Sequence, residues 1–128
     1  YGFDTFEGLT AAHHIAEEHH EVGEFSDTTI DAVREFIDSN NVHLVSGLFP
    51  DSVDYGTAKK IALAHIDTDY YLSVKACIEF ILPRMVKGGM IIFDDYGWSN
   101  CQGVERAIKE ANLPIVVSAE YQALYLHR

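Results

Sequence analysis

Two apolar runs that end in acidic residues decide the fold of this chain. The first, IALAHIDTDYY, extends from Ile61 to Tyr71, and the second, GGMIIFDDY, extends from Gly88 to Tyr96. Each run has the length of a β-strand, and the sequence between them has the apolar periodicity of a helix. This β–α–β pattern is typical of parallel strands in an α/β sheet.

The acidic residues after these runs predict a metal site. In an open α/β sheet, ligands bind at the carboxyl ends of the strands, so Asp67, Asp69, Asp94 and Asp95 would surround one crevice. Carboxylates that lie so close raise one another's pKa unless a cation lies among them. Oxygen ligands suit a hard divalent cation such as Mg²⁺. The alternative is that these acids only cap turns.

The composition excludes several classes of protein. The chain has 128 residues, of which 48% are hydrophobic, and this is enough for one domain with a core. A net charge of −11 argues against a nucleic-acid partner, because phosphate binding requires Lys and Arg. No apolar run reaches the ~20 residues of a membrane span. Cys77 and Cys101 make no disulfide framework, so we expect free thiols and a cytoplasmic location.

The other elements follow from periodicity and turn signals. We expect an amphipathic helix at Thr28–Asp38 with Ser26 or Asp27 as its N-cap. The strand at Lys60–Asp67 is apolar enough to be buried on both faces. The further predictions are strands at Tyr1–Asp4, Val42–Ser46 and Met90–Phe93, a link at 52–60, helices at Tyr71–Val86 and Val104–Ala111, a turn at Lys87–Gly89, and a hairpin of Ile115–Ser118 with Ala123–His127. Residues 1–128 therefore form a single three-layer α/β domain with a mostly parallel sheet and a C-terminal antiparallel hairpin.

Residues 10–25 are rich in histidine and glutamate. No two of these histidines are four positions apart, which is the spacing of a zinc-binding helix. His14 and Glu18 are still able to chelate a metal weakly. We expect a solvated, partly helical cover over the active site, with an intrinsic metal site as the alternative.

Five motifs occur in an order that resembles one enzyme family. They are DTFEGL from Asp4 to Leu9, GEF from Gly23 to Phe25, VSGLFPD from Val45 to Asp51, HIDTDYY from His65 to Tyr71, and GGMIIFDDYG from Gly88 to Gly97. The set resembles the macrocin O-methyltransferase family, which contains metal-dependent class I methyltransferases that use S-adenosylmethionine (SAM). The resemblance covers nearly the whole chain and implies a Rossmann-like SAM methyltransferase fold.

The resemblance also implies a role for each matching residue. Asp67, Asp94 and Asp95 look like ligands of Mg²⁺, and Asp67 also borders the SAM site. Asp4 looks like the acid that accepts both ribose hydroxyls of SAM, because one carboxylate can take two charge-assisted hydrogen bonds. The adenine pocket would be lined by Phe6, Ser46, Gly47, Leu48 and Phe49.

The implied reaction is methyl transfer to a hydroxyl of a small molecule of sugar or natural-product type. The metal would hold two neighbouring oxygens of the acceptor and lower the pKa of one of them. Asp69 is our first candidate for a general base, and His65 and Tyr70 are the others. One alternative is a receiver-type signalling domain, although its acid pair follows the first strand. Another is a non-catalytic fragment that binds metal but not SAM.

The residue at which the sequence opens affects which strands we expect in the sheet. In the resembled family, the first strand and a glycine-rich SAM turn precede the ribose acid, whereas this sequence opens at Tyr1. We therefore expect an N-terminally truncated domain that lacks the strand between the second and the fourth. Either those two strands pair directly, or a partner chain covers their exposed edges, and for this reason we expect a homo-oligomer.

Overall fold

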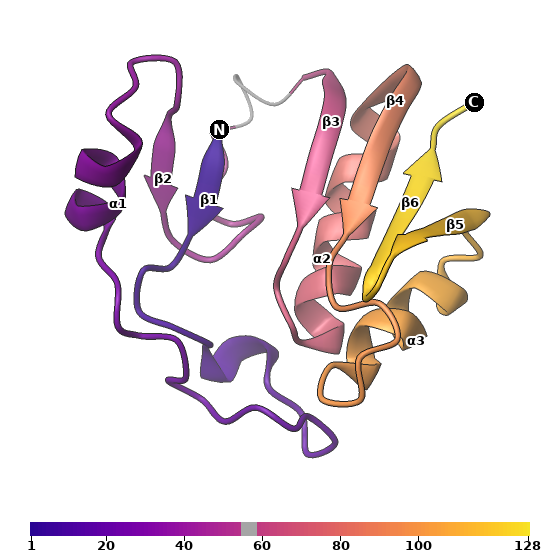
Figure 1. Cartoon of the computed structure of the whole chain (residues 1–128), viewed down its shortest axis with the longest axis horizontal. Coiled ribbons are helices and arrows are strands. Elements are labelled where there is room, and N and C mark those ends of the chain that lie inside the picture. The colour runs from indigo at the N-terminus through magenta and orange to yellow at the C-terminus, as the bar shows by residue number, and fades with distance from the viewer. Residues whose placement is uncertain (55–58) are drawn as a thin grey trace.

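The computed structural model describes residues 1–54 and 59–128, so part of the predicted link at 52–60 lies outside the described residues. The strands are β1 (Gly2–Asp4), β2 (Leu44–Ser46), β3 (Ile61–Ile66), β4 (Met85–Phe93), β5 (Ile115–Ala119) and β6 (Gln122–Leu126). The α-helices are α1 (Ile30–Ile37), α2 (Tyr71–Ile81) and α3 (Gln102–Glu110). Short 3₁₀ turns occupy Ala11–His13 and Leu82–Arg84. The order confirms the predicted α/β class (Figure 1).

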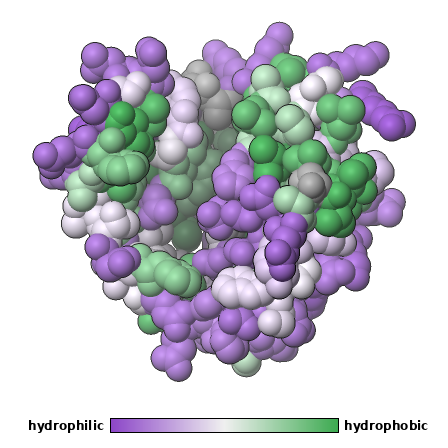
Figure 2. All heavy atoms as spheres, viewed as in Figure 1, coloured by the Kyte–Doolittle hydropathy of each residue, from purple (hydrophilic) through white to green (hydrophobic). Residues whose placement is uncertain are grey.

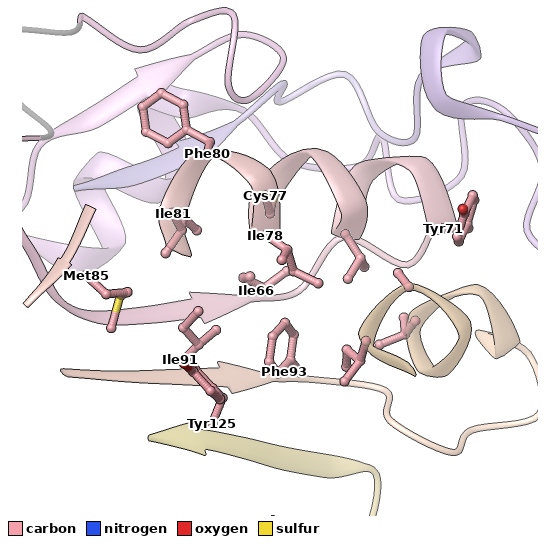
Figure 3. Packing of buried hydrophobic residues seen from close by; sticks show 14 of the residues in the cluster. Ile66, Tyr71, Cys77, Ile78, Phe80, Ile81, Met85, Ile91, Phe93 and Tyr125 are labelled. Atoms are coloured by element: carbon pink, nitrogen blue, oxygen red, sulfur yellow. The ribbon is translucent and has the colours of Figure 1, made fainter. Parts of the chain in front are cut away.

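The larger sheet has four strands in the order β3-β4-β6-β5. The β3–β4 pair is parallel, while β6 runs antiparallel to both β4 and β5, so the predicted C-terminal hairpin at the sheet edge is confirmed. Helices α2 and α3 pack on one face of this sheet (Figure 1). Figure 3 shows Ile78 of α2 and Ile66, Ile91 and Phe93 of the strands meeting in that layer. Burial of these apolar side chains is the main force that holds the layers together.

The register between β3 and β4 brings the two acidic strand ends together. Ile66 is opposite Phe93, and the Asp94 amide donates a hydrogen bond to the Ile66 carbonyl over 2.9 Å. Asp67 and Asp94 therefore leave the sheet side by side at its carboxyl edge. The two acids are 27 positions apart in the chain, and the parallel β–α–β unit alone makes them neighbours.

The helix that follows β3 is shorter than predicted. We expected Tyr71–Val86, but α2 ends at Ile81, and Met85 and Val86 already belong to β4. Pro83 explains the difference, because it cannot donate to an α-helical hydrogen bond and here opens a 3₁₀ turn. The predicted turn at Lys87–Gly89 is also wrong, because these residues lie within β4, where the register with β3 shifts.

Strands β1 and β2 form a separate parallel sheet, in which Asp4 is opposite Ser46. Of the two alternatives, direct pairing of the first strand with the strand at 61–67 is therefore not found among the described residues. Burial of β3 on both faces is wrong: β3 is an edge strand, and Leu63 is 60% exposed. A groove of about 640 Å³ lies between the two sheets, lined by residues 1–4 and 60–68. Figure 2 shows the molecule hollowed between these two parts.

Helix α1 lies outside the two-stranded sheet, and Thr29 is its N-cap in place of the predicted Ser26 or Asp27. The Thr29 side chain accepts a hydrogen bond from the Ala32 amide over 3.2 Å. Residues 10–25, which we call the strap, cross below the carboxyl ends of β1, β3 and β4 (Figure 1). The strap is less helical than expected, with one 3₁₀ turn at Ala11–His13. Among the described residues, no helix has the length and apolar character needed to cross a membrane.

Candidate active site

A cavity of about 600 Å³ lies at the carboxyl ends of four strands, β1, β2, β3 and β4. Most residues singled out from the sequence line it: Asp4, Gly47, Leu48, Phe49, Asp67, Asp69, Asp94 and Asp95. Phe6 and Ser46 are not among its lining residues. The strand ends thus bring together residues from both halves of the chain. This is the position in which open α/β sheets bind ligands.

Asp67 and Asp94 form the wall at the end of the large sheet. Asp67 is exposed to the cavity, yet nearby protein atoms partly desolvate its carboxylate and raise its pKa, and the charges of Asp94 and Asp95 raise it further. Gln122 donates from its Nε2 to Asp94 Oδ1 over 3.3 Å, and His65 Nε2 lies 3.8 Å from Asp94 Oδ2. Asp94 is therefore oriented from two sides, while its charge still repels that of Asp67.

Asp69 and Asp95 form a closer cluster with Cys101. One ligand atom from each of the three lies within 4.8 Å of the other two. The Cys101 thiol, fully buried, donates to Asp69 Oδ1 over 3.7 Å. Burial raises the pKa of Asp95 to about 6, and the hydrogen bond to Asp69 and the charge of that residue add to the shift. Burial also raises the pKa of Asp69. Two ionised carboxylates this close repel each other unless a proton or a cation lies between them.

The opposite wall comes from β1, β2 and the loops that follow them. The Phe6 amide donates to Asp4 Oδ1 over 2.6 Å, which fixes the direction of this carboxylate. Ser46 is bound to the same loop, because its hydroxyl donates to the Thr5 carbonyl over 3.3 Å. Gly47 has a φ of 136°, and a Cβ there would lie 2.8 Å from the Cβ of Ser52. Only glycine fits this position, so the backbone itself forms the cavity wall.

The strap closes the remaining side and is attached to the start of α2. Glu18 Oε1 accepts a hydrogen bond from the Tyr71 amide over 2.7 Å and so caps the helix from outside. The Tyr70 hydroxyl donates to the His20 carbonyl over 3.0 Å, and His13 Nδ1 lies 3.0 Å from Ser73 Oγ. Tyr70, one of the candidate bases, is only 1% exposed and uses its hydroxyl in this contact.

Several residues at the site were not identified from the sequence. Cys101 was interpreted only as a free loop thiol, and Gln122 received no role. Phe25 and Trp98 also line the cavity as aromatic walls. Neither Cys101 nor Gln122 carries a local signal, because Cys101 reaches Asp69 from the loop that follows β4 and Gln122 reaches Asp94 through the pairing of β6 with β4.

The fold is the α/β arrangement of solved O-methyltransferases. The solved O-methyltransferase NovP superimposes with a TM-score of 0.83 at 18% identity, over 98% of this chain and 58% of that one. The calicheamicin methyltransferase CalS11 gives a TM-score of 0.74 at 24% identity, with the same coverage. A second structure of CalS11, described as a TDP-rhamnose 3'-O-methyltransferase, gives 0.56 at 27% identity over 65% of this chain and 41% of that one.

The sequence comparison identifies the family. The profile of the macrocin-O-methyltransferase (TylF) family matches residues 1–116, so the chain belongs to this family. A Streptomyces olivaceus protein, 8-demethyl-8-(2,3-dimethoxy-alpha-L-rhamnosyl)-tetracenomycin-C 4'-O-methyltransferase, is 30% identical over 63 residues, which are 49% of this chain and 24% of that protein. The chain spans a quarter of this curated relative and just over half of the first two solved structures.

Proposed function

We propose that this chain is a SAM-dependent, divalent-metal-dependent O-methyltransferase that acts on a hydroxyl of a small molecule of sugar or natural-product type. The names of two relatives, one acting on a rhamnosyl-tetracenomycin and one on TDP-rhamnose, support a deoxysugar attached to a natural product or a nucleotide as the acceptor. One observation carries the proposal: the cavity has the ribose-type acid Asp4 on one wall and the acids of β3 and β4 on the other.

The donor set fits a hard cation. Asp67, Asp94 and Asp95 would hold Mg²⁺ through carboxylate oxygens. Burial and, after it, the neighbouring acids raise the pKa of Asp67 and Asp95, and a cation would offset both effects. When bound, the metal supplies a positive charge that acidifies an acceptor hydroxyl. Gln122 and His65 hold the Asp94 carboxylate in place for this purpose. No nucleic-acid or membrane partner enters the proposal.

The opposite wall fits a nucleoside. Asp4, whose Oδ1 is held by the Phe6 amide, would accept the ribose hydroxyls, and the adenine ring would lie in the part of the cavity lined by Gly47 and Phe49. SAM supplies an activated methyl group at this position. The residues of this wall bind and orient it, while the strap limits the access of water.

Asp69 remains our candidate for the general base. Burial raises its pKa, which makes the carboxylate a stronger proton acceptor, and the Cys101 thiol holds its Oδ1. Asp69 lies two residues past the proposed ligand Asp67.

Calorimetry of the full chain tests the proposal. We expect heat on titration with S-adenosylhomocysteine, and a loss of affinity of about tenfold or more in Asp4→Asn, which removes a charge-assisted hydrogen bond. Asp94→Asn should abolish Mg²⁺ binding and leave the nucleoside heat intact. Asp51→Asn, an exposed acid outside the cavity, is the matched control.

A second candidate function is a metal-binding fragment that does not bind SAM. The groove between the two sheets favours it, because no described strand joins the Asp4 wall to the metal wall. Mg²⁺ binding that Asp94→Asn abolishes, together with no heat from S-adenosylhomocysteine, would select this alternative.

A further inference from the structure

Two aromatic side chains form one side of the cavity. Phe25 ends the strap, and Trp98 lies in the loop between β4 and α3. Both line the cavity together with the acids of β3 and β4. Phe25 is 57% exposed, so a ligand in the cavity can reach its ring. Both rings pack against the buried His20, at 5.3 Å for Phe25 and 5.8 Å for Trp98 between ring centroids, and this common contact fixes their relative position.

The backbone at Phe25 has a conformation that bulky residues seldom adopt. Its φ is 61°, in the left-handed region. The strap is closed directly before it, because the Leu9 amide donates to the Glu24 carbonyl over 2.9 Å and the Gly23 amide donates to the Leu9 carbonyl over 2.8 Å. Strained residues of this kind gather at ligand sites. Phe25 and Trp98 therefore offer an apolar contact surface to a ligand in the cavity.

The acids around this aromatic pair give the cavity a strong negative charge. Its lining includes the carboxylates of Asp4, Asp27, Asp67, Asp69, Asp94 and Asp95. No Lys or Arg is among the described residues that line it. On the side of the strap, burial raises the pKa of Tyr70, and the negative charges of Glu18 and Glu24 raise it further. One Mg²⁺ held by Asp67, Asp94 and Asp95 would still leave the cavity with a net negative charge.

The described groups that could bind a phosphate near this cavity are distant or engaged. Lys60, directly before β3, and Lys87, near the start of β4, lie at the opposite end of these strands from the acids. The N-terminus of α2 is already capped, because the Tyr71 amide donates to Glu18 Oε1 over 2.7 Å. Proteins bind phosphate with Lys, Arg or the amides of a helix N-terminus. A nucleotide diphosphate in this cavity would instead face carboxylates that repel it.

We infer that the methyl acceptor is an electrically neutral glycoside whose apolar aglycone packs on Phe25 and Trp98, and that a sugar linked to a nucleotide diphosphate is excluded. This inference rests on the proposed function and narrows its acceptor class. The sugar hydroxyls lie toward the acids of β3 and β4, and the aglycone covers the aromatic pair. Burial of the aglycone on the two rings supplies affinity, and charge repulsion rejects the diphosphate.

The fluorescence of Trp98 tests this inference directly, because Trp98 is the single tryptophan of the chain. Phenyl α-L-rhamnoside and TDP-rhamnose are titrated separately into the full chain with MgCl₂. We expect phenyl α-L-rhamnoside to change the Trp98 emission and to bind about tenfold more tightly than TDP-rhamnose, or better. Added NaCl should improve the binding of TDP-rhamnose, because salt screens the repulsion. Equal or tighter binding of TDP-rhamnose, or an emission that the phenyl glycoside leaves unchanged, would overturn the inference.

A pair of variants locates the aglycone. Phe25→Ala should weaken the binding of phenyl α-L-rhamnoside about tenfold, whereas methyl α-L-rhamnoside, which has no aryl group, should bind as it does to the wild type. Phe36→Ala, which removes a 90% exposed ring of α1 outside the cavity, is the matched control and should bind both glycosides like the wild type. Equal losses for the two glycosides in Phe25→Ala, or no loss for either, would overturn the inference.

Failure of the inference and failure of the proposed function have different signs. The titrations with the glycosides need only Mg²⁺, so they decide the acceptor class whether or not the chain binds the cofactor. The absence of heat with S-adenosylhomocysteine is the sign that the proposed function has failed.

Discussion

Asp95→Asn should stabilise the metal-free protein and remove its response to Mg²⁺. Asp95 has a positive φ of 57°, a conformation that Asn tolerates as well as Asp does. The amide is almost the same size as the carboxylate and donates to Asp69 in place of repelling it. The substitution therefore removes a charge from the crowded cluster with little change of shape.

The magnitude follows from the pKa of Asp95. A rise from the model-compound value of 3.8 to about 6 would correspond to about 3 kcal/mol at 1.36 kcal/mol per pKa unit. Because the carboxylate keeps some contact with solvent, screening reduces this to about 1–2 kcal/mol. An acid whose pKa is raised on folding lowers the free energy of unfolding while it is ionised. The loss of stability is complete above pH 6 and disappears as the pH falls toward 3.8.

Urea unfolding followed by circular dichroism measures the effect. In EDTA at pH 7.5, Asp95→Asn should be about 1–2 kcal/mol more stable than the wild type, and the two should converge near pH 4. MgCl₂ should stabilise the wild type by mass action and leave the variant unchanged. Asp38→Asn, an exposed acid that also has a positive φ, is the control. A variant that is less stable in EDTA, or that Mg²⁺ stabilises as much as the wild type, would refute the reasoning.

Three further predictions address other parts of the chain. Cys101→Ala should lower kcat about tenfold, because it frees the Asp69 carboxylate, while Cys101→Ser keeps a donor and most of the rate. Equal methylation rates for the two variants would contradict this. Gly47→Ala should lower the free energy of unfolding by about 1–3 kcal/mol, because its φ of 136° strains any side chain; urea titration measures the loss, and an unchanged midpoint would count against it. Thr29→Ala should cost about 1 kcal/mol and speed amide exchange within α1, whereas exchange at wild-type rates would show that the cap is dispensable.

The apolar periodicity of the chain and the acidic residues at strand ends predict part of the fold. The run from Ile61 to Asp67 and the run from Met90 to Asp95 identify two parallel strands with acids at one edge, because the alternation and length of such segments are local properties. The C-terminal hairpin follows in the same way. The boundary errors at Thr29 and at Ile81–Met85 concern single turns, where a cap or a proline decides the end of the helix.

Contacts between distant segments were decided by the tertiary structure alone. The sequence shows neither the split into two sheets nor the exposure of Leu63, because both depend on which strand lies next to β3. By contrast, the sequence alone determined that acidic residues follow the ends of β3 and β4. Only packing decided that Cys101 meets Asp69 and that His20 is buried beside Trp98, since these contacts join residues 32 and 78 positions apart. Local pattern specifies the strands that supply the site, and the folded core selects the partners of each side chain.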